Sequence, residues 1–225
     1  MPLQPRRPTL PDLVDLRCAD ACNVEWPAAD LVLTDPPWSY TEQHGATAAE
    51  DHYDGLTASE IAVLLDGLRA PRLAMWLTWP LLGEWIDASE GWSWGAPVTG
   101  GAWCKSGPGD TGHYGPGFHW AGCSEIILVY TRGKTHTDRG ATLRNAWIEP
   151  PTQHSRKPVE FQARMVERWC PPAGVVLDPF AGLGSVAEAV VMAGGGRRYV
   201  GTEIDPDRYA GAMSLVAQRA ARVQR

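Results

Sequence analysis

The feature that most constrains the fold of this chain is a glycine-rich turn between an apolar run and a helical segment. Residues 175–177 read Val-Val-Leu, the turn occupies 178–185 and a helical pattern follows it. Residues 198–203 then form another strand-like run. A strand, a turn, a helix and a second strand predict a parallel βαβ unit. Gly182 and Gly184 would let the backbone of this turn approach a ligand closely.

The same alternation of strand-like and helical segments runs along the whole chain. It predicts an α/β fold with a mainly parallel sheet and helices on both faces. A length of 225 residues fits one medium domain, which we place over 1–225. Further strands are expected at 13–16, 31–34, 73–78, 98–103 and 125–130. Helices are expected at 57–70, 81–89, 158–170, 185–192 and 207–222.

Three segments lack this periodicity and are expected to be long loops. They are 39–56, 105–122 and 131–153, and they are rich in polar residues or turn formers. Loops of this length in a compact domain usually have a function or are mobile. The first loop ends at Thr57, which has Glu60 at the spacing of a helix capping box.

The charge of the chain counts mildly against a nucleic-acid partner. The formal net charge is −6 and the sequence pI is near 5.5, whereas nucleic-acid binding usually leaves a basic footprint. A local basic strip can nevertheless be sufficient. The strip in this chain consists of Arg132, Lys134, Arg139 and Arg144, and its alternative interpretation is a solvated loop.

The cysteines and the apolar runs narrow the class of protein further. Five scattered cysteines fit neither a disulfide framework nor a metal site, so we expect reduced thiols, no metal and a cytoplasmic protein. No apolar run approaches the roughly 20 residues of a membrane span. The first ten residues lack the apolar stretch of a signal peptide.

A second motif, Asp35-Pro36-Pro37-Trp38, directly follows the apolar run 31–34. It suits chemistry on an exocyclic amino group such as that of adenine, whose lone pair is delocalised into the ring. Asp35 could accept one N–H and the Pro36 carbonyl the other, which would favour a more tetrahedral, nucleophilic nitrogen. The two prolines would stiffen the loop, and Trp38 could stack on the base. The alternative is a turn that simply ends the strand.

The glycine turn alone does not identify its ligand. Gly182-x-Gly184-x-x-Ala187 also fits the dinucleotide fingerprint, and Glu203 lies near the expected distance for a ribose-binding carboxylate. A nicotinamide-dependent oxidoreductase is therefore one alternative, and a turn without a ligand is another. Only one strand–helix unit follows the turn, however, whereas a classical dinucleotide-binding half requires more.

Taken together, these motifs resemble those of amino-group DNA methyltransferases, the family that includes N6-adenine methylases. The segment 178–185 resembles the cofactor motif of that family, and 201–206 resembles the next motif, whose acidic residue binds ribose. The segment 154–158 resembles the motif that packs on the methionine end of the cofactor. Asp20 matches an acidic residue that contacts the cofactor's adenine. The catalytic motif comes before the cofactor motif, as in the permuted β-type order.

Some segments are more similar to one branch of these enzymes, the MT-A70-like adenine methyltransferases. They are Trp103-Cys104-Lys105, the loop 112–120 and the strand-like run 125–133. Glu125 in that run matches an acidic position of the branch, although it could simply begin a strand.

The resemblance implies a Rossmann-like fold and methyl transfer from S-adenosylmethionine to the N6 amino group of adenine. A target in double-stranded DNA would have to flip into the pocket formed by Asp35, Pro36, Pro37 and Trp38. The cofactor-binding residues that it implies are Asp20, His154, Ser155, Lys157, Asp178, Phe180, Gly182, Gly184, Ser185 and Glu203.

The substrate is the least constrained part of this interpretation. Aspartate before Pro-Pro favours adenine, since serine is more usual in the cytosine-N4 members of the resembling family. RNA adenine, cytosine N4 and a non-catalytic nucleic-acid-binding protein are the alternatives. The three long loops are candidate substrate-recognition insertions. A homodimer would give a small acidic chain more surface for contact with DNA.

Overall fold

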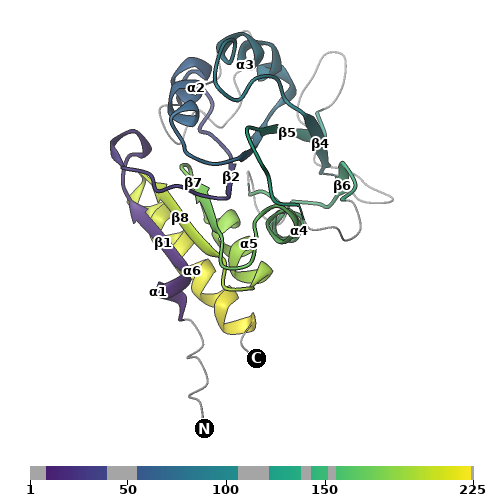
Figure 1. The fold of residues 1–225 in the computed structure, drawn as a ribbon. Helices are drawn as coiled ribbons and strands as arrows, with labels where there is room; N and C mark the ends of the chain where they lie inside the picture. Colours follow the sequence, from purple (N-terminus) through teal and green to yellow (C-terminus); the bar gives the residue numbers. More distant parts are fainter. Residues whose placement is uncertain (1–8, 40–54, 106–121, 138–142, 152–155, 224–225) are drawn as a thin grey trace.

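The computed structural model of the chain describes residues 9–39, 55–105, 122–137, 143–151 and 156–223. In these residues the strands form one eight-stranded sheet in the order β1-β8-β7-β2-β3-β5-β4-β6 (Figure 1). The strands are β1 (Val14–Cys18), β2 (Leu31–Thr34), β3 (Arg72–Leu77), β4 (Thr99–Cys104), β5 (Ser124–Thr131), β6 (Ala146–Ile148), β7 (Val175–Asp178) and β8 (Arg198–Glu203).

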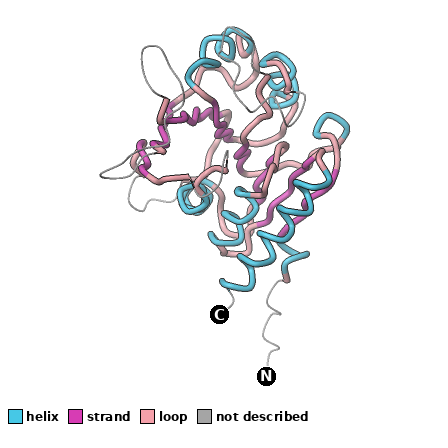
Figure 2. Tube along the Cα trace, turned by 180° about the vertical axis from the view of Figure 1, so that it is seen from behind, coloured by secondary structure: helices cyan, strands magenta, loops and turns pink. Residues whose placement is uncertain are grey.

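Helices cover both faces of the sheet (Figures 1 and 2). On one face α4, α5 and α6 pack side by side, and on the other α2 packs against α3. The predicted α/β fold, with a mainly parallel sheet between helices, is therefore confirmed. The helices are α1 (Leu10–Leu13), α2 (Ala58–Asp66), α3 (Leu82–Ala88), α4 (Val159–Trp169), α5 (Ser185–Ala193) and α6 (Pro206–Val223), with 3₁₀ turns η1 (Ala21–Asn23) and η3 (Trp79–Leu81).

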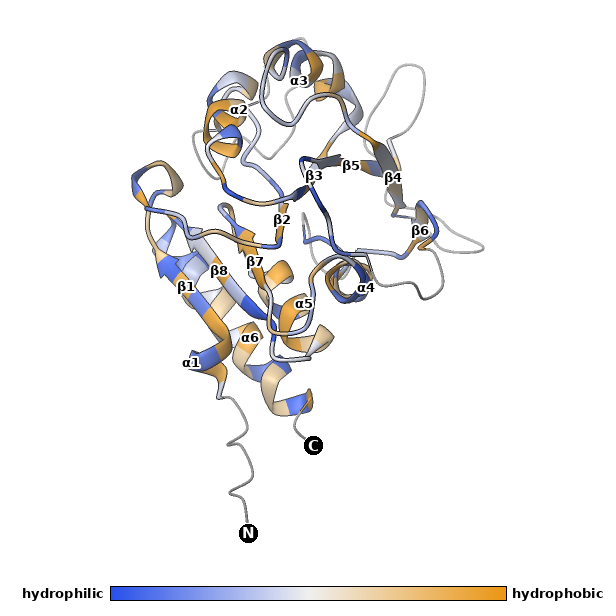
Figure 3. Cartoon of the chain, viewed as in Figure 1, coloured by the Kyte–Doolittle hydropathy of each residue, from blue (hydrophilic) through white to orange (hydrophobic). Residues whose placement is uncertain are grey.

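The two-sided cover explains the composition of the central strands. Every residue of β2 and of β3 is buried, and β7 is apolar along most of its length (Figure 3). A strand that is covered on both faces reads as a continuous apolar run, not as an alternation. Helix α6 instead has a single buried stripe, formed by Ala212, Val216 and Ala220, as expected of a surface helix.

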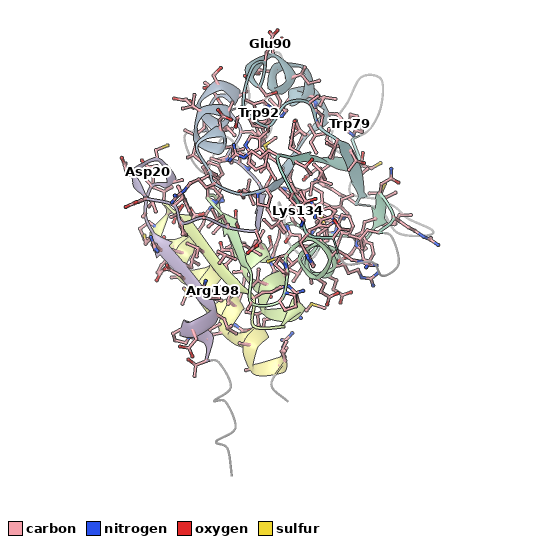
Figure 4. The ribbon with its side chains drawn as sticks, viewed as in Figure 1. Asp20, Trp79, Glu90, Trp92, Lys134 and Arg198 are labelled. Carbon is pink, nitrogen blue, oxygen red and sulfur yellow. The ribbon has the colours of Figure 1, made fainter. Side chains whose placement is uncertain are left out.

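The direction of the strands brings several chain segments to one edge of the sheet. Strands β1, β8, β7, β2 and β3 are mutually parallel, whereas β5 is antiparallel to β3 and to β4. The carboxyl ends of the parallel strands therefore lie at the same edge as the end of β4 and the start of β5. Asp20 lies near this edge and Arg198, which begins β8, lies toward the opposite one (Figure 4).

Local signals in the sequence placed most elements correctly. Thr57 N donates to Glu60 at 2.9 Å and Glu60 N donates to Thr57 Oγ1 at 3.3 Å, so the capping box is confirmed. Helix α2 ends before the expected position because Gly67 occupies its C-cap. Most of the expected loops 39–56 and 105–122 lies outside the described residues.

One strand was missed. Strand β6 lies in 131–153, a segment expected to be a loop, and it pairs in parallel with β4. Its three residues are too few for a visible alternation. Trp147 of this strand stacks on Phe161 with the ring centroids 5.2 Å apart, so a distant contact stabilises it. Within the described residues no helix is both long and apolar enough to cross a membrane.

Candidate active site

A cavity of about 340 Å³ lies at the carboxyl edge of the sheet. The loop after β1, the turn after β2, the glycine turn and the end of β8 all contribute to its lining. It brings the predicted catalytic motif and the predicted cofactor motif into one space. The predicted site residues in its lining are Asp20, Asp35, Pro37, Lys157, Asp178, Phe180, Gly182, Ser185 and Glu203.

Glu203 is held by backbone amides. Gly182 N donates to Glu203 Oε2 at 2.7 Å, and Asp205 N donates to Oε1 at 2.9 Å. Burial raises the pKa of Glu203, and these two hydrogen bonds oppose that effect. Each carboxylate oxygen has a further lone pair, so the side chain can still accept a hydroxyl group of a ligand.

The two glycines of the turn have different roles. Gly182 has φ +53°, and a Cβ atom added there would meet nothing within 4 Å, so its main chain is open to a ligand. Gly184 has φ +75°, but a Cβ atom on it would lie 3.0 Å from Ala212 Cβ. Gly184 does not line the cavity. This glycine lets α5 pack closely on α6, and its role as a cofactor contact stays a prediction.

Asp178 joins three parts of the edge. It accepts hydrogen bonds from Thr34 Oγ1 at 2.8 Å, from Tyr199 Oη at 3.2 Å and from Phe180 N at 3.3 Å. Burial raises the pKa of Asp178 to about 7. The side chain thus links β7 to β2 and β8, and it borders the cavity at the junction of the two motifs.

Asp35 is held by charged side chains. Its carboxylate pairs with Lys157, whose ammonium also contacts Glu125 Oε2 at 2.9 Å, and Glu125 pairs in turn with Lys105. Burial raises the pKa of Asp35 and Lys157 opposes it. Burial disfavours the charged form of Lys157, but the two carboxylates outweigh this and raise its pKa. Lys157 therefore remains an ammonium between two acids.

The remainder of the Asp-Pro-Pro-Trp motif is mostly structural. The Pro36 carbonyl accepts Trp38 N at 3.0 Å, which closes a tight turn. Trp38 is 7 % exposed, its Nε1 donates to the Trp76 carbonyl at 3.2 Å, and its ring packs edge-on against Trp85. Trp38 is not among the residues that line the cavity, and its buried contacts favour a structural role over the expected stacking on a base. The core needs this indole, and its N–H has found a buried acceptor.

An exposed indole lies at the same edge. Trp79 follows the end of β3, is 55 % exposed, and donates from Nε1 to Ser124 Oγ at 3.0 Å (Figure 4). Ser124 precedes Glu125 at the start of β5. The hydrogen bond fixes the orientation of the ring while one surface remains open to solvent.

Sequence reasoning did not assign a role to Arg156, although it belongs to the predicted segment 154–158. Its side chain is 10 % exposed, lines the cavity and pairs with Glu188, which also binds Arg219. Among the described residues, no acceptor reaches Arg156 Nε. A buried donor of this kind usually has a partner, so it fits an anionic group of a ligand.

The charged residues of the lining favour a cationic ligand. In the part of the cavity that the structure describes, acids outnumber bases. The acids are Asp20, Asp35, Asp178, Glu203 and Asp205, and the bases are Arg156, Lys157 and Arg208. Asp20 accepts hydrogen bonds from Cys22 N and from the Asn23 amide, which fix it in the loop after β1.

The predicted basic strip is only partly intact. Arg132 stacks over the Trp94 ring at 3.9 Å and donates to the carbonyls of Ala70 and Asp66, so its guanidinium stabilises the fold and its assignment to the strip is corrected. Lys134 and Arg144 are exposed.

Three predicted residues, His154, Ser155 and Arg139, lie outside the described residues. Among the residues that are described, no group of three or more His, Cys, Asp or Glu side chains is arranged to hold a metal ion.

Comparison with known proteins agrees with this geometry. The family model described as DNA methylase, for the N6/N4 enzymes, matches residues 116–214. The resemblance to amino-group DNA methyltransferases is confirmed. The matched segment includes β5, α4, the glycine turn and β8, but it does not include Asp35. No curated protein sequence matches the chain significantly.

Solved structures share the fold over nearly the whole chain. The M1.HpyAVI complex with S-adenosylmethionine is 16 % identical with a TM-score of 0.66, covering 90 % of this chain and 100 % of that one. TTHA0409 of Thermus thermophilus, also solved with S-adenosylmethionine, is 22 % identical with a TM-score of 0.67 and coverages of 92 % and 95 %. The cytosine-N4-specific PvuII DNA methyltransferase is 9 % identical with a TM-score of 0.63 and coverages of 94 % and 92 %. The fold is therefore the Rossmann-like fold of these methyltransferases.

Proposed function

We propose that this chain transfers a methyl group from S-adenosylmethionine to the exocyclic N6 amino group of adenine in DNA. The observation that carries this proposal is the position of Asp35. It lines the same cavity as Glu203 and the open backbone of Gly182, although these residues are far apart in the sequence. A group that can orient an amino nitrogen thus lies beside a site suited to a small cofactor.

The cavity residues fit S-adenosylmethionine. Glu203 has lone pairs for the ribose hydroxyls, and Asp20 can accept the amino group of the adenine ring. The unpartnered Nε of Arg156 fits the carboxylate of the methionine part. The acidic excess of the lining suits a ligand with a positive sulfonium and a net positive charge. When bound, the cofactor supplies a methyl group whose bond to sulfur breaks, both electrons remaining on sulfur.

The residues of the chain would act on the acceptor nitrogen. Asp35 accepts one N–H of the amino group. Pro36 is not among the residues that line the cavity, but its carbonyl, which accepts Trp38 N, keeps a second lone pair that can accept the other N–H. The nitrogen lone pair then forms the new N–C bond. The methylated nitrogen must lose one proton, and Asp35, whose pKa is raised by burial, is the base beside it.

The type of nucleic acid and the target base are each supported by a separate observation. The DNA methylase family match supports DNA. An aspartate at position 35 favours adenine, while the likeness to the PvuII enzyme keeps cytosine N4 as the second candidate. A base in a duplex would have to flip out to reach Asp35. We further propose that 39–56, 105–122 and 131–153 recognise the substrate within a single domain, and that the protein is cytoplasmic and forms a homodimer.

A nicotinamide dinucleotide fits this cavity less well. Its two phosphates are negative, and the acids of the lining would oppose them. Isothermal calorimetry with each compound separates the two functions. We expect S-adenosylmethionine to bind and NAD to give no measurable heat. Binding of NAD together with no binding of S-adenosylmethionine would refute the proposed function.

A further inference from the structure

We propose that Glu125 is a positioning residue for methyl transfer, which holds the Lys157 ammonium against the carboxylate of Asp35. This inference rests on the proposed function. Glu125 does not belong to the described lining of the cavity, so it acts through Lys157 and not by touching a ligand.

The contacts form one continuous chain of alternating charge. Lys105 pairs with Glu125, Glu125 with Lys157 at 2.9 Å, and Lys157 with Asp35. The side chains of Lys157 and Glu125 are 7 % and 9 % exposed, whereas that of Asp35 is 32 % exposed and that of Lys105 26 %. This series of ion pairs therefore extends from the cavity through the interior to the surface at the end of β4.

The anchor points explain why two acceptors are needed. Asp35 follows β2, Glu125 lies in β5, and the two strands are separated by β3. Lys157 just precedes α4 and reaches both of them. A lysine head on a flexible four-carbon stem has three donors and no preferred fork geometry. A single carboxylate would leave this ammonium mobile. A second carboxylate on β5, which is separated from β2 by β3, fixes its position.

The electrostatic balance gives Glu125 a second effect on Asp35. The ionisable groups that act on Asp35 are Lys157 before α4, Glu125 on β5 and Lys105 at the end of β4, and Asp178 on β7 interacts with it. The cations stabilise the ionised carboxylate, and Glu125 opposes them. The desolvation cost of burying these charges is offset because each of them faces a charge of opposite sign. Removal of one charge therefore shifts the titration of Asp35 in a predictable direction.

The test compares Glu125→Gln with Lys157→Met. Transfer requires ionised Asp35, so kcat/KM rises with pH through the pKa of this group. The rising part of this pH profile is its acid limb. Loss of the Glu125 charge should move the acid limb to lower pH by roughly half to one pH unit. Loss of the Lys157 charge should move it to higher pH by one unit or more, on the order expected for adjacent charges. In Glu125→Gln the Lys157 ammonium should stay paired with Asp35 but in more than one geometry, so the plateau kcat should fall about tenfold.

Glu160→Gln is the matched control. Glu160 lies in the first turn of α4, close in sequence to Lys157, but it is exposed, it does not line the cavity, and it belongs to none of the ion pairs that join Lys105, Glu125, Lys157 and Asp35. Its variant should keep the pH profile of the wild type. If Glu125→Gln lowers kcat but leaves the acid limb in place, Glu125 is only a structural residue and the inference is overturned.

A titration without turnover separates the inference from the proposed function. The Asp35 carboxyl, assigned by Asp35→Asn, is followed by carbon-13 NMR in the same variants. Opposite displacements of its midpoint in Glu125→Gln and Lys157→Met support the link, even if the wild type transfers no methyl group and the proposed function fails. Identical midpoints in all variants overturn the inference, whatever the activity.

Discussion

Glu203 and Asp35 lie at one edge of the sheet, but they are held in opposite ways. In the half that contains β1, β8 and β7, the carboxylate of Glu203 is fixed by two backbone N–H groups. In the half that contains β2, β3, β5 and β4, the carboxylate of Asp35 is fixed by an ammonium and the charges behind it. Backbone amides do not titrate, whereas ion pairs respond to every charge in their chain.

The difference suits two different tasks. A cofactor site benefits from donors and acceptors that keep their geometry over a wide pH range. A group that must accept an N–H and receive a proton benefits from a charge that its neighbours can tune. The two halves should therefore respond separately to substitution: one in cofactor affinity, the other in the rate and pH dependence of transfer.

The largest effect is expected at Asp35. Asp35→Ala removes the acceptor of the target amino group, and transfer should fall about a thousandfold, as for the loss of a central polar catalytic group. The affinity for S-adenosylmethionine should stay near that of the wild type, because Glu203 and the glycine turn are unchanged. Labelled methyl transfer and calorimetry measure the two quantities. An equal loss of methyl transfer and of cofactor affinity would show that the two halves do not have separate tasks.

Asp178 connects the two halves of the sheet, and its contribution can be tested through the free energy of unfolding. A pKa raised from 3.8 to about 7 on folding means that the folded state favours the protonated carboxyl. Its stabilising contribution is full below about pH 4 and is lost as the pH rises toward 7. Relative to Asp178→Asn, the wild type should lose up to about 4 kcal/mol of unfolding free energy over that interval. Denaturant unfolding at several pH values checks this, and a pH-independent difference would contradict it.

Glu203→Ala should act on the cofactor half alone. It removes the acceptor for the amides of Gly182 and Asp205 and leaves both donors without a partner in the protein. The dissociation constant for S-adenosylmethionine should rise about 10- to 100-fold, which corresponds to the usual cost of such a loss. At saturating cofactor the acid limb of the pH profile should not move. A shifted limb would mean that the halves are electrostatically coupled.

The two indoles Trp79 and Trp38 give a smaller contrast. Trp79→Ala should weaken DNA binding about tenfold without lowering thermal stability, because an exposed aromatic surface at the catalytic edge suits stacking on a base. Trp38→Phe should instead lower stability, because it removes the buried hydrogen bond to Trp76. Fluorescence anisotropy and thermal melts distinguish the two. Equal loss of DNA binding in both would restore Trp38 as a base contact.

The smallest effects are expected at the basic strip. Lys134→Gln and Arg144→Gln should each reduce the slope of log affinity against log salt concentration by about one. Arg132→Gln should leave the slope unchanged and lower stability by about 1–2 kcal/mol, since its guanidinium stacks on Trp94 and binds carbonyls. An unchanged slope in all three variants would make the strip a solvated surface.

Much of the fold could be predicted because its signals are local. The apolar run before Asp178, the glycines after it and the Thr57–Glu60 box each need only neighbouring residues to be recognised. Strand β6 could not, since it depends on pairing with β4 and on a Trp147–Phe161 stack.

The site divides along the same line. The motif residues could be named from the sequence, but the contacts that tune them are long-range. Lys157 meets Asp35 across 122 positions in the chain. The residue types of Trp38 and Arg132 suit ligand binding, so the sequence predicts binding roles for them. In the structure, Trp38 instead donates to the Trp76 carbonyl and Arg132 stacks on Trp94.

The most direct test of the central claim is nucleoside mass spectrometry after incubation of mixed DNA and RNA with methyl-labelled S-adenosylmethionine. The wild type should produce labelled N6-methyldeoxyadenosine, and Asp35→Ala should produce none above background. Label only in N4-methyldeoxycytidine or only in RNA would move the substrate to one of the alternatives. No labelled nucleoside with the wild type, or equal labelling with Asp35→Ala, would contradict methyl transfer directed by Asp35.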